Sequence, residues 1–107
     1  MTELAPAIAR MIAATNAGDS EAFVACFTDD AHLEDWGRGF HGHDGVARWN
    51  QSDNIGRRAH FEAAGVTGDD ADQVVTLVVT GGGFNGTSDI AFRVRDDLIE
   101  RLIISAD

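Results

Sequence analysis

A chain of 107 residues with 44% hydrophobic residues and a net charge of −10 is expected to fold as one soluble domain over residues 1–107. The acidic balance and the lack of any basic run exclude nucleic acid, whose phosphates need neutralisation, and disfavour an anionic membrane surface. No apolar run approaches the roughly 18 to 20 residues of a membrane span, the first residues carry no basic leader, and the single Cys26 suits a reducing compartment, so we expect a cytoplasmic protein.

The first part of the chain is predicted to form two helices. Apolar side chains within residues 4–15 recur at helical spacing, and residues 16–18 (Asn-Ala-Gly) supply a helix stop. Asp19 or Ser20 is expected to cap a second, shorter helix, because either side-chain oxygen can accept a backbone N–H of the first turn. We expect residues 28–30 to form the turn that follows.

A short strand and a third helix come next. Residues 31–35 are expected to form the strand, and the glycine-rich residues 36–42 a loop with short extended character. His43 or Asp44 is expected to cap the third helix, which ends within residues 52–56.

Beyond this helix the hydrophobic pattern changes from helical to strand periodicity. Four strands are expected, over residues 58–66, 73–80, 87–95 and 98–105. Helices followed by an antiparallel meander indicate an α+β fold, in which three N-terminal helices cover the concave face of a curved antiparallel sheet. The last strand is apolar on both parities, so we expect it to be buried on both sides, with one face at the cavity of this cone and the other at a dimer interface.

Asp35 is the strongest candidate for chemistry. Side chains alternate along a strand, so Asp35 shares its face with Ala31 and Leu33, while His32 and Glu34 share the other. A carboxylate at the end of an apolar row, turned into a closed cavity, has its pKa raised by desolvation and suits a general base near neutral pH. The alternative is that Asp35 only starts the following turn by accepting a backbone N–H bond.

Composition narrows the chemistry further. All eight basic residues are arginine and tyrosine is absent, which excludes a lysine Schiff base and a phenol acting as acid or oxyanion donor. His41 and His43 have a spacing at which two histidines can share a metal, but His43 is better explained by a helix start. We therefore expect no metal and no organic cofactor, and we keep His41 as a candidate acid partner of Asp35.

Several segments resemble the NTF2-like superfamily. They are Asn16-Ala17-Gly18-Asp19, Phe27-Thr28-Asp29-Asp30-Ala31, Glu34-Asp35, Gly42 and Trp49, in that order, with a looser match over residues 90–99. The branch to which they are most similar holds the SnoaL-like polyketide cyclases and the ketosteroid isomerases. The resemblance implies the cone fold, a hydrophobic cavity and a homodimer formed through the sheet. It does not imply one function, because the superfamily ranges from isomerases to non-catalytic binding domains.

The resemblance carries over unevenly to individual residues. Asp35 falls at the position of the isomerase general base, but Met11 falls where those enzymes have a catalytic tyrosine and Ile90 where an aspartate is usual. Classical steroid isomerisation is therefore not expected, because its oxyanion would lack the Tyr–Asp donor pair. An epoxide hydrolase of this family needs two carboxylates bracketing an arginine. Residues 93–96 do not supply this arrangement, because Asp96 lies in a turn.

Two hypotheses for the function remain open. In the first, the cavity holds a small apolar or aromatic molecule and Asp35 removes a proton beside a carbonyl, in a cofactor-free isomerisation or cyclisation. In the second, the domain binds a ligand or dimerises without catalysis. In both, we expect the cavity wall to include Met11, Phe27, Leu33, Trp36, Phe40, Trp49, Phe61, Ile90 and Phe92.

Overall fold

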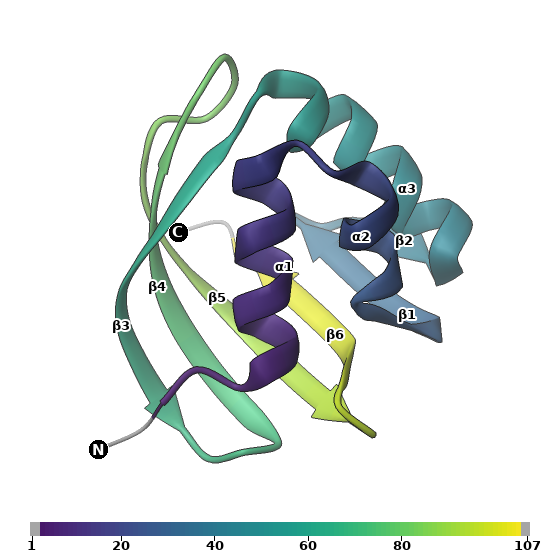
Figure 1. The fold of residues 1–107 in the computed structure, drawn as a ribbon, viewed down its shortest axis with the longest axis vertical. Coiled ribbons are helices and arrows are strands. Elements are labelled where there is room, and N and C mark those ends of the chain that lie inside the picture. Colours follow the sequence, from purple (N-terminus) through teal and green to yellow (C-terminus); the bar gives the residue numbers. More distant parts are fainter. Residues whose placement is uncertain (1–2, 106–107) are drawn as a thin grey trace.

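A curved six-stranded sheet with three α-helices on one side makes up residues 3–105, the part of the chain that this computed structural model describes (Figure 1). The helices are α1 (Pro6–Ala17), α2 (Ser20–Ala25) and α3 (Gly42–Asp53), the last followed by a short 3-10 helix, η1 (Ile55–Arg57). The strands are β1 (Phe27–Asp35), β2 (Arg38–His41), β3 (His60–Gly68), β4 (Asp72–Thr80), β5 (Gly86–Arg95) and β6 (Leu98–Ile104). Within these residues, no helix has the length and apolar character needed to cross a membrane.

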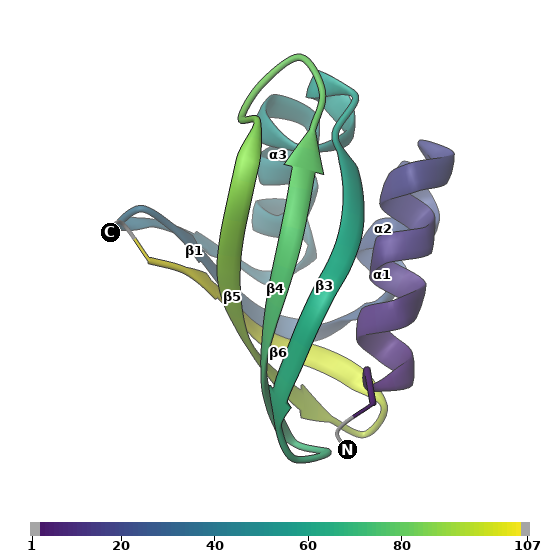
Figure 2. The same ribbon diagram turned by 90° about the vertical axis from the view of Figure 1, so that its left-hand side faces the viewer.

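The strands are ordered β2-β1-β6-β5-β4-β3 in the sheet. Neighbouring strands are antiparallel except β1 and β6, which are parallel. The predicted α+β class is confirmed, but the sheet is mixed rather than wholly antiparallel, because β6 returns from the β5 hairpin to lie beside the first strand of the chain. Figure 2 looks onto β3, β4 and β5, with α3, β1 and β6 crossing behind them.

The predicted boundary between the first two helices is confirmed. α1 ends at Gly18, which has a φ of 69° in the left-handed region that glycine adopts without strain. Asp19 Oδ1 accepts the backbone N–H of Ala22 at 3.0 Å and so begins α2. Asn16 also binds the sheet: its side-chain amide donates to the carbonyl of Phe61 at 2.9 Å and accepts the N–H of Phe61 at 2.7 Å. These two hydrogen bonds fix the end of α1 against β3.

β1 and α3 both extend beyond their predicted bounds. β1 begins at Phe27, so residues 28–30, predicted as a turn, belong to the strand. α3 begins at Gly42 with His41 as its N-cap, and the His41 side chain makes no capping hydrogen bond. His43, predicted as a cap, has another partner: its Nε2 donates to the carbonyl oxygen of Phe27 at 2.8 Å. The start of α3 is thereby tied to the start of β1.

A bulge explains why β6 is apolar on both parities. The register between β5 and β6 shifts next to Val94, so that Ile99 pairs with Val94 while Leu102 pairs with Phe92. Ile99 and Leu102 differ in parity, yet both are fully buried in the core. The bulge thus brings Ile99 and Leu102, of opposite parity, to the same inner face, while Ile103 lies half-buried beside Ala91 on the outer face. Burial of that outer face against a second copy stays a prediction.

The hydrophobic core fills the end of the cone that α1 and α2 cover. The rings of Phe23 and Phe27 lie 5.2 Å apart between centroids, and the ring of Trp49 stacks on Phe23 at 6.1 Å. Fully burying an aromatic or aliphatic side chain of this size stabilises the fold by about 1.5–3 kcal/mol. The largest fully buried apolar side chains are Phe23, Phe27, Ile8, Met11, Leu33, Leu77, Ile99 and Leu102.

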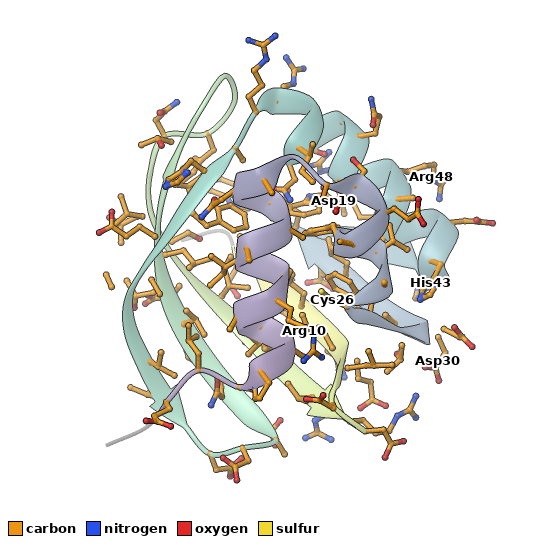
Figure 3. All side chains as sticks on the ribbon, in the orientation of Figure 1. Arg10, Asp19, Cys26, Asp30, His43 and Arg48 are labelled. Carbon is orange, nitrogen blue, oxygen red and sulfur yellow. The ribbon has the colours of Figure 1, made fainter. Side chains whose placement is uncertain are left out.

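Cys26 belongs to this core and is not a reactive thiol. It lies near Arg10, between α1 and α2 (Figure 3), and its Sγ donates to the carbonyl oxygen of Ala22 at 3.3 Å. Burial raises the pKa of the Cys26 thiol, and the nearby Arg10 offsets only part of that rise. A buried thiol held protonated in this way is a packing residue.

Candidate functional site

A cavity of about 290 Å³ lies among the C-terminal part of α3, η1, the β1–β2 turn and the β4–β5 loop. Its inner wall is apolar, formed by Trp49, Phe61, Val79, Ile90 and Ile104. Polar groups enter the wall from Asp35, Asp53, Asn54 and Ser88, and the exposed rim consists of Trp36, Arg57, Gly83 and Phe84. An apolar pocket with a few convergent polar groups is the usual form of a small-molecule site, and this volume is at the small end of the range, roughly 300–1,000 Å³.

Asp35 is anchored at the end of β1 by one of its two carboxylate oxygens. Oδ2 accepts hydrogen bonds from Trp49 Nε1 and from Arg38 Nη2, each at 2.9 Å. The side chain is 15% exposed, and Oδ1 accepts no hydrogen bond from any residue that the structure describes. The alternative turn-starting role is not seen in these contacts, because the partners are side chains rather than a backbone N–H. The carboxylate is therefore fixed in direction through Oδ2 alone.

Arg38 lies between two carboxylates that line the cavity, Asp35 and Asp53. Its Nη2 is 2.9 Å from Asp35 Oδ2 and 3.3 Å from Asp53 Oδ1. The hydrogen bond to Asp53, followed by the charges of Asp53 and Asp35, raises the pKa of Arg38 further above its ordinary value. Two carboxylates bracketing an arginine were not expected at residues 93–96. Such an arrangement forms instead at Arg38 of β2, between Asp35 of β1 and Asp53 of α3.

The residues expected in the cavity wall divide into three groups. Trp36, Trp49, Phe61 and Ile90 line the cavity. Met11, Phe27, Leu33 and Phe92 are at most 3% exposed and lie in the packed core, because α1 and α2 fill that end of the cone. Phe40, on β2, borders a shallow depression against α3 instead, together with Arg48 and Gln51.

His41 does not face Asp35. It pairs across the β1–β2 hairpin with His32, the Nδ1 atoms are 3.4 Å apart, and the ring centroids are 4.6 Å apart. His32 lies on the face of β1 opposite to Asp35, so the candidate acid partner is on the wrong side of the sheet for that role. Among the described residues, no cluster of three or more histidine, cysteine or acidic side chains is arranged to hold a metal ion.

The end of α3 contributes site residues that the sequence analysis did not single out. Asp53 lies one turn after Trp49 on the same helix face, a spacing that signals a shared environment. Asn54 is 1% exposed; its Nδ2 donates to Thr15 Oγ1 and to Asn50 Oδ1, both at 3.1 Å, while its Oδ1 has no partner within the described residues. Asn54 thus joins α1 to the end of α3 while its Oδ1 is left without a protein partner at the cavity wall.

The fold recurs in solved structures of related proteins. A protein from Sinorhizobium meliloti, provisionally assigned as a polyketide cyclase, is 25% identical, with 95% of each chain covered and a TM-score of 0.82. A protein provisionally assigned as a ketosteroid isomerase, from Kribbella flavida, is 16% identical, with 94% of this chain and 75% of that one covered and a TM-score of 0.79. A Mycobacterium tuberculosis protein in complex with estradiol-17β-hemisuccinate is 19% identical, with 94% and 91% covered and a TM-score of 0.78.

Comparison with protein-family models agrees with the comparison of structures. No curated protein sequence gives a significant match. The model of the SnoaL-like domain, by contrast, matches residues 8–102, which is most of the chain and includes the core, α3 and most of the cavity wall. The resemblance drawn from the sequence segments is thus confirmed: this chain belongs to the SnoaL-like domain family, within the NTF2-like superfamily.

Proposed function

We propose that the cavity binds a small apolar or aromatic molecule and that Asp35 acts on it as a general base. The base would remove a proton beside a carbonyl group, in an isomerisation or a cyclisation that needs no metal and no organic cofactor. The observation that carries this proposal is the asymmetric anchoring of Asp35, whose Oδ2 is held by Trp49 and Arg38 while Oδ1 stays unbonded at the cavity. A positioned base of this kind contributes roughly 10²–10⁴-fold to a rate.

Ser88 supplies a donor for the negative charge that proton removal creates. It lies two residues before Ile90 on β5, shares the inner face with it, and borders the cavity. Its hydroxyl makes no hydrogen bond to another described residue, so it is available to the enolate oxygen of a ligand. A single donor of this kind is weaker than the Tyr–Asp pair of a classical steroid isomerase, for which Met11 and Ile90 offer no substitute.

A related structure supports the binding of a small ligand by this fold. The Mycobacterium tuberculosis neighbour was solved with a steroid ester, which indicates that this fold can hold a rigid apolar molecule. The cavity of about 290 Å³ in the present chain favours a smaller ligand, of one or two rings.

Asp35→Asn tests the catalytic part of the proposal directly. 2-Tetralone in deuterated water exchanges the protons beside its carbonyl, and NMR follows that exchange. The wild-type protein is expected to accelerate it, and Asp35→Asn is expected to lose about 10²-fold or more of that acceleration while keeping its fold. Asp53→Asn serves as the matched control, since it removes the same charge from the same entrance. Equal exchange by wild type and Asp35→Asn would remove Asp35 from the mechanism.

A non-catalytic binding domain is the alternative that the apolar wall favours. Ile90 contributes no acid group, and Arg38 already neutralises part of the charge of Asp35. In that case 2-tetralone would bind and raise the melting temperature, because a ligand selective for the folded state stabilises it. Its proton exchange would stay at the rate in buffer.

Hydration of an epoxide is a second candidate reaction, favoured by the position of Arg38 between Asp35 and Asp53. One group, as a carboxylate, would take a proton from water while the water oxygen attacks carbon and the C–O bond of the epoxide breaks. The other, starting as a carboxylic acid, would give its proton to the epoxide oxygen and regain one from the first after the diol forms. Styrene oxide is a suitable probe. Diol formation that disappears in both Asp35→Asn and Asp53→Asn would favour hydration over proton abstraction at carbon, which needs Asp35 alone.

We also propose that two copies associate through the outer face of the sheet. Val74 and Val78 are 41% and 36% exposed on β4, and the register places Val74 beside Ala91, which in turn pairs with Ile103. Burial of this apolar row against a second copy removes it from water, which is favourable. Light scattering is expected to give the mass of a dimer for the wild type and of a monomer for Val74→Glu.

A further inference from the structure

Arg57 stands out among the arginines of this acidic chain. Four of the eight arginines, Arg10, Arg38, Arg93 and Arg95, form ion pairs with carboxylates in the described residues. Arg57 is not among them, and of the remaining four it is the one that lines the cavity. A cation at the cavity rim that makes no ion pair with a described carboxylate is available to bind an anionic group from outside the chain.

The stem of Arg57 is held while its terminal nitrogens stay free. Nε donates to the carbonyl oxygen of Ser52 at 3.1 Å, and the Arg57 carbonyl accepts the N–H of Gly82 at 2.8 Å. Its Cβ and Cγ lie against Gly83, where an added side chain would come within 3.3 and 3.4 Å of them. The two Nη groups make no hydrogen bond to a described residue. The guanidinium is thus partly pre-positioned, which lowers the entropy lost when it binds an anion.

The other charges at the entrance determine which end of a ligand Arg57 can hold. Asp35 and Asp53 both contact Arg38, and Asp53 Oδ2 accepts from Ser52 Oγ at 2.7 Å, so each Asp53 oxygen has a partner other than Arg57. An acidic group beside Asp35 would be repelled, and the inner wall is apolar. An acidic group therefore belongs at the rim beside Arg57, with the uncharged part of the molecule directed inward.

Two exposed aromatic side chains lie at the rim of the cavity together with Arg57. Trp36 is 61% exposed in the β1–β2 turn, and Phe84 is 54% exposed in the β4–β5 loop. Both border the same cavity, although they come from separate loops. Large aromatic surfaces left in water at the mouth of a cavity offer their faces to a flat ring system.

From these observations we infer that the ligand is a flat aromatic or alicyclic carboxylate, with its acid group on Arg57 and its rings between the rim aromatics and the inner wall. The inference rests on the proposed ligand-binding function and adds the chemical class of the ligand. The negative net charge does not prevent this binding at physiological salt, where charges more than about 8 Å apart are largely screened. At short range, the guanidinium and the carboxylate form a charge-assisted, two-pronged contact.

Calorimetric titration with 2-naphthoate and with its uncharged analogue 2-naphthamide tests the inference. The wild type is expected to bind the acid about three- to tenfold more tightly than the amide, the range for an ion pair at an exposed rim. Arg57→Gln is expected to abolish this preference while leaving the affinity for the amide unchanged. Arg48→Gln is the matched control. Arg48 lies on α3 (Figure 3), borders the depression beside Phe40 instead of this cavity, and also lacks an ion pair among the described residues.

The possible outcomes separate this inference from the function on which it rests. If the wild type binds both compounds equally, or if Arg48→Gln reduces the preference as much as Arg57→Gln does, the assignment of Arg57 is overturned while ligand binding stands. If neither compound binds the wild type, the proposed binding function fails and this inference fails with it.

Discussion

The two ends of the cone are built differently, although one sheet forms both. At the end covered by α1 and α2, Phe23, Phe27 and Leu102 are at most 1% exposed and belong to the packed core. At the end beside α3, Trp36 and Phe84 are more than half exposed, and charged groups enter the wall. Close packing at the end covered by α1 and α2 therefore stabilises the fold. The residues at the end beside α3 are less constrained by packing and are available for a binding role.

Trp49 is the boundary between these two ends. One face of its indole stacks on Phe23 in the core, and its Nε1 donates to Asp35 in the cavity. The same side chain therefore contributes to packing and to the direction of the proposed base. Substitutions at the two ends, and at this boundary, separate stability from activity.

The largest effect is expected from removing a ring at the packed end. Phe23→Ala should lower the free energy of unfolding by about 3–5 kcal/mol, because it removes buried surface and leaves a cavity against Phe27 and Trp49. Phe84→Ala, an aromatic truncation at the open end, should change it by no more than about 0.5 kcal/mol. Urea unfolding of both variants measures the contrast. Similar losses would show that the ends are not independent.

Trp49→Phe is expected to lower the free energy of unfolding by an intermediate amount and also to slow the proposed reaction. Phenylalanine keeps the stacking on Phe23 but loses the N–H donated to Asp35, which should cost about 1–2 kcal/mol of stability. The exchange of 2-tetralone protons should also slow, since the carboxylate loses one of its two anchors. A variant with normal exchange and reduced stability would restrict Trp49 to a packing role.

Ser88→Ala should affect activity and leave stability nearly unchanged. The hydroxyl borders the cavity and has no hydrogen-bond partner in the described residues, so its removal should change the unfolding free energy by less than about 0.5 kcal/mol. If it donates to the enolate, the exchange rate should fall by about tenfold or more. Thr87→Ala, at the neighbouring outward position of β5, is the control and should change neither quantity.

The smallest effect lies outside both ends, in the β3–β4 turn. Backbone N–H groups of Asp72 and then Ala71 bind the Asp69 carboxylate and lower the pKa of Asp69, with a smaller contribution from Arg93. Because the folded pKa lies below the unfolded value of about 3.9, the stabilisation is present above that pH and is lost as the pH falls through the folded pKa. Asp69→Asn should therefore be less sensitive than wild type to acid below about pH 4 in thermal melts.

The packed end was largely predictable from local sequence signals. Helical spacing before Gly18, the cap at Asp19 and the alternation around Ile90 and Phe92 each depend on neighbouring residues only. The parallel contact of β1 with β6 was not predictable in this way, because a strand pattern does not specify its partner. The bulge next to Val94 was not predictable either. Its only trace in the sequence is that residues of both parities are apolar in β6.

The open end was predictable only in part. The parity of β1 correctly grouped Asp35 with the buried Ala31 and Leu33. Arg57 carries no local signal, because a polar residue after a helix usually only marks its end. Placing it at the cavity requires knowing how η1 meets Gly83 of the distant β4–β5 loop. Contacts of this kind depend on the assembled fold rather than on spacing.

The contact between Asn16 and Phe61 has a consequence for behaviour in concentrated solution. β3 is the last strand of the sheet, and Asn16 occupies both backbone hydrogen-bonding groups of Phe61. Those groups are directed away from β4, toward the free edge of β3. A strand from another molecule would otherwise pair with that edge. The Asn16 side-chain amide thus takes the hydrogen bonds that a seventh strand would make at this point. It blocks this part of the edge strand β3 and so opposes edge-to-edge aggregation.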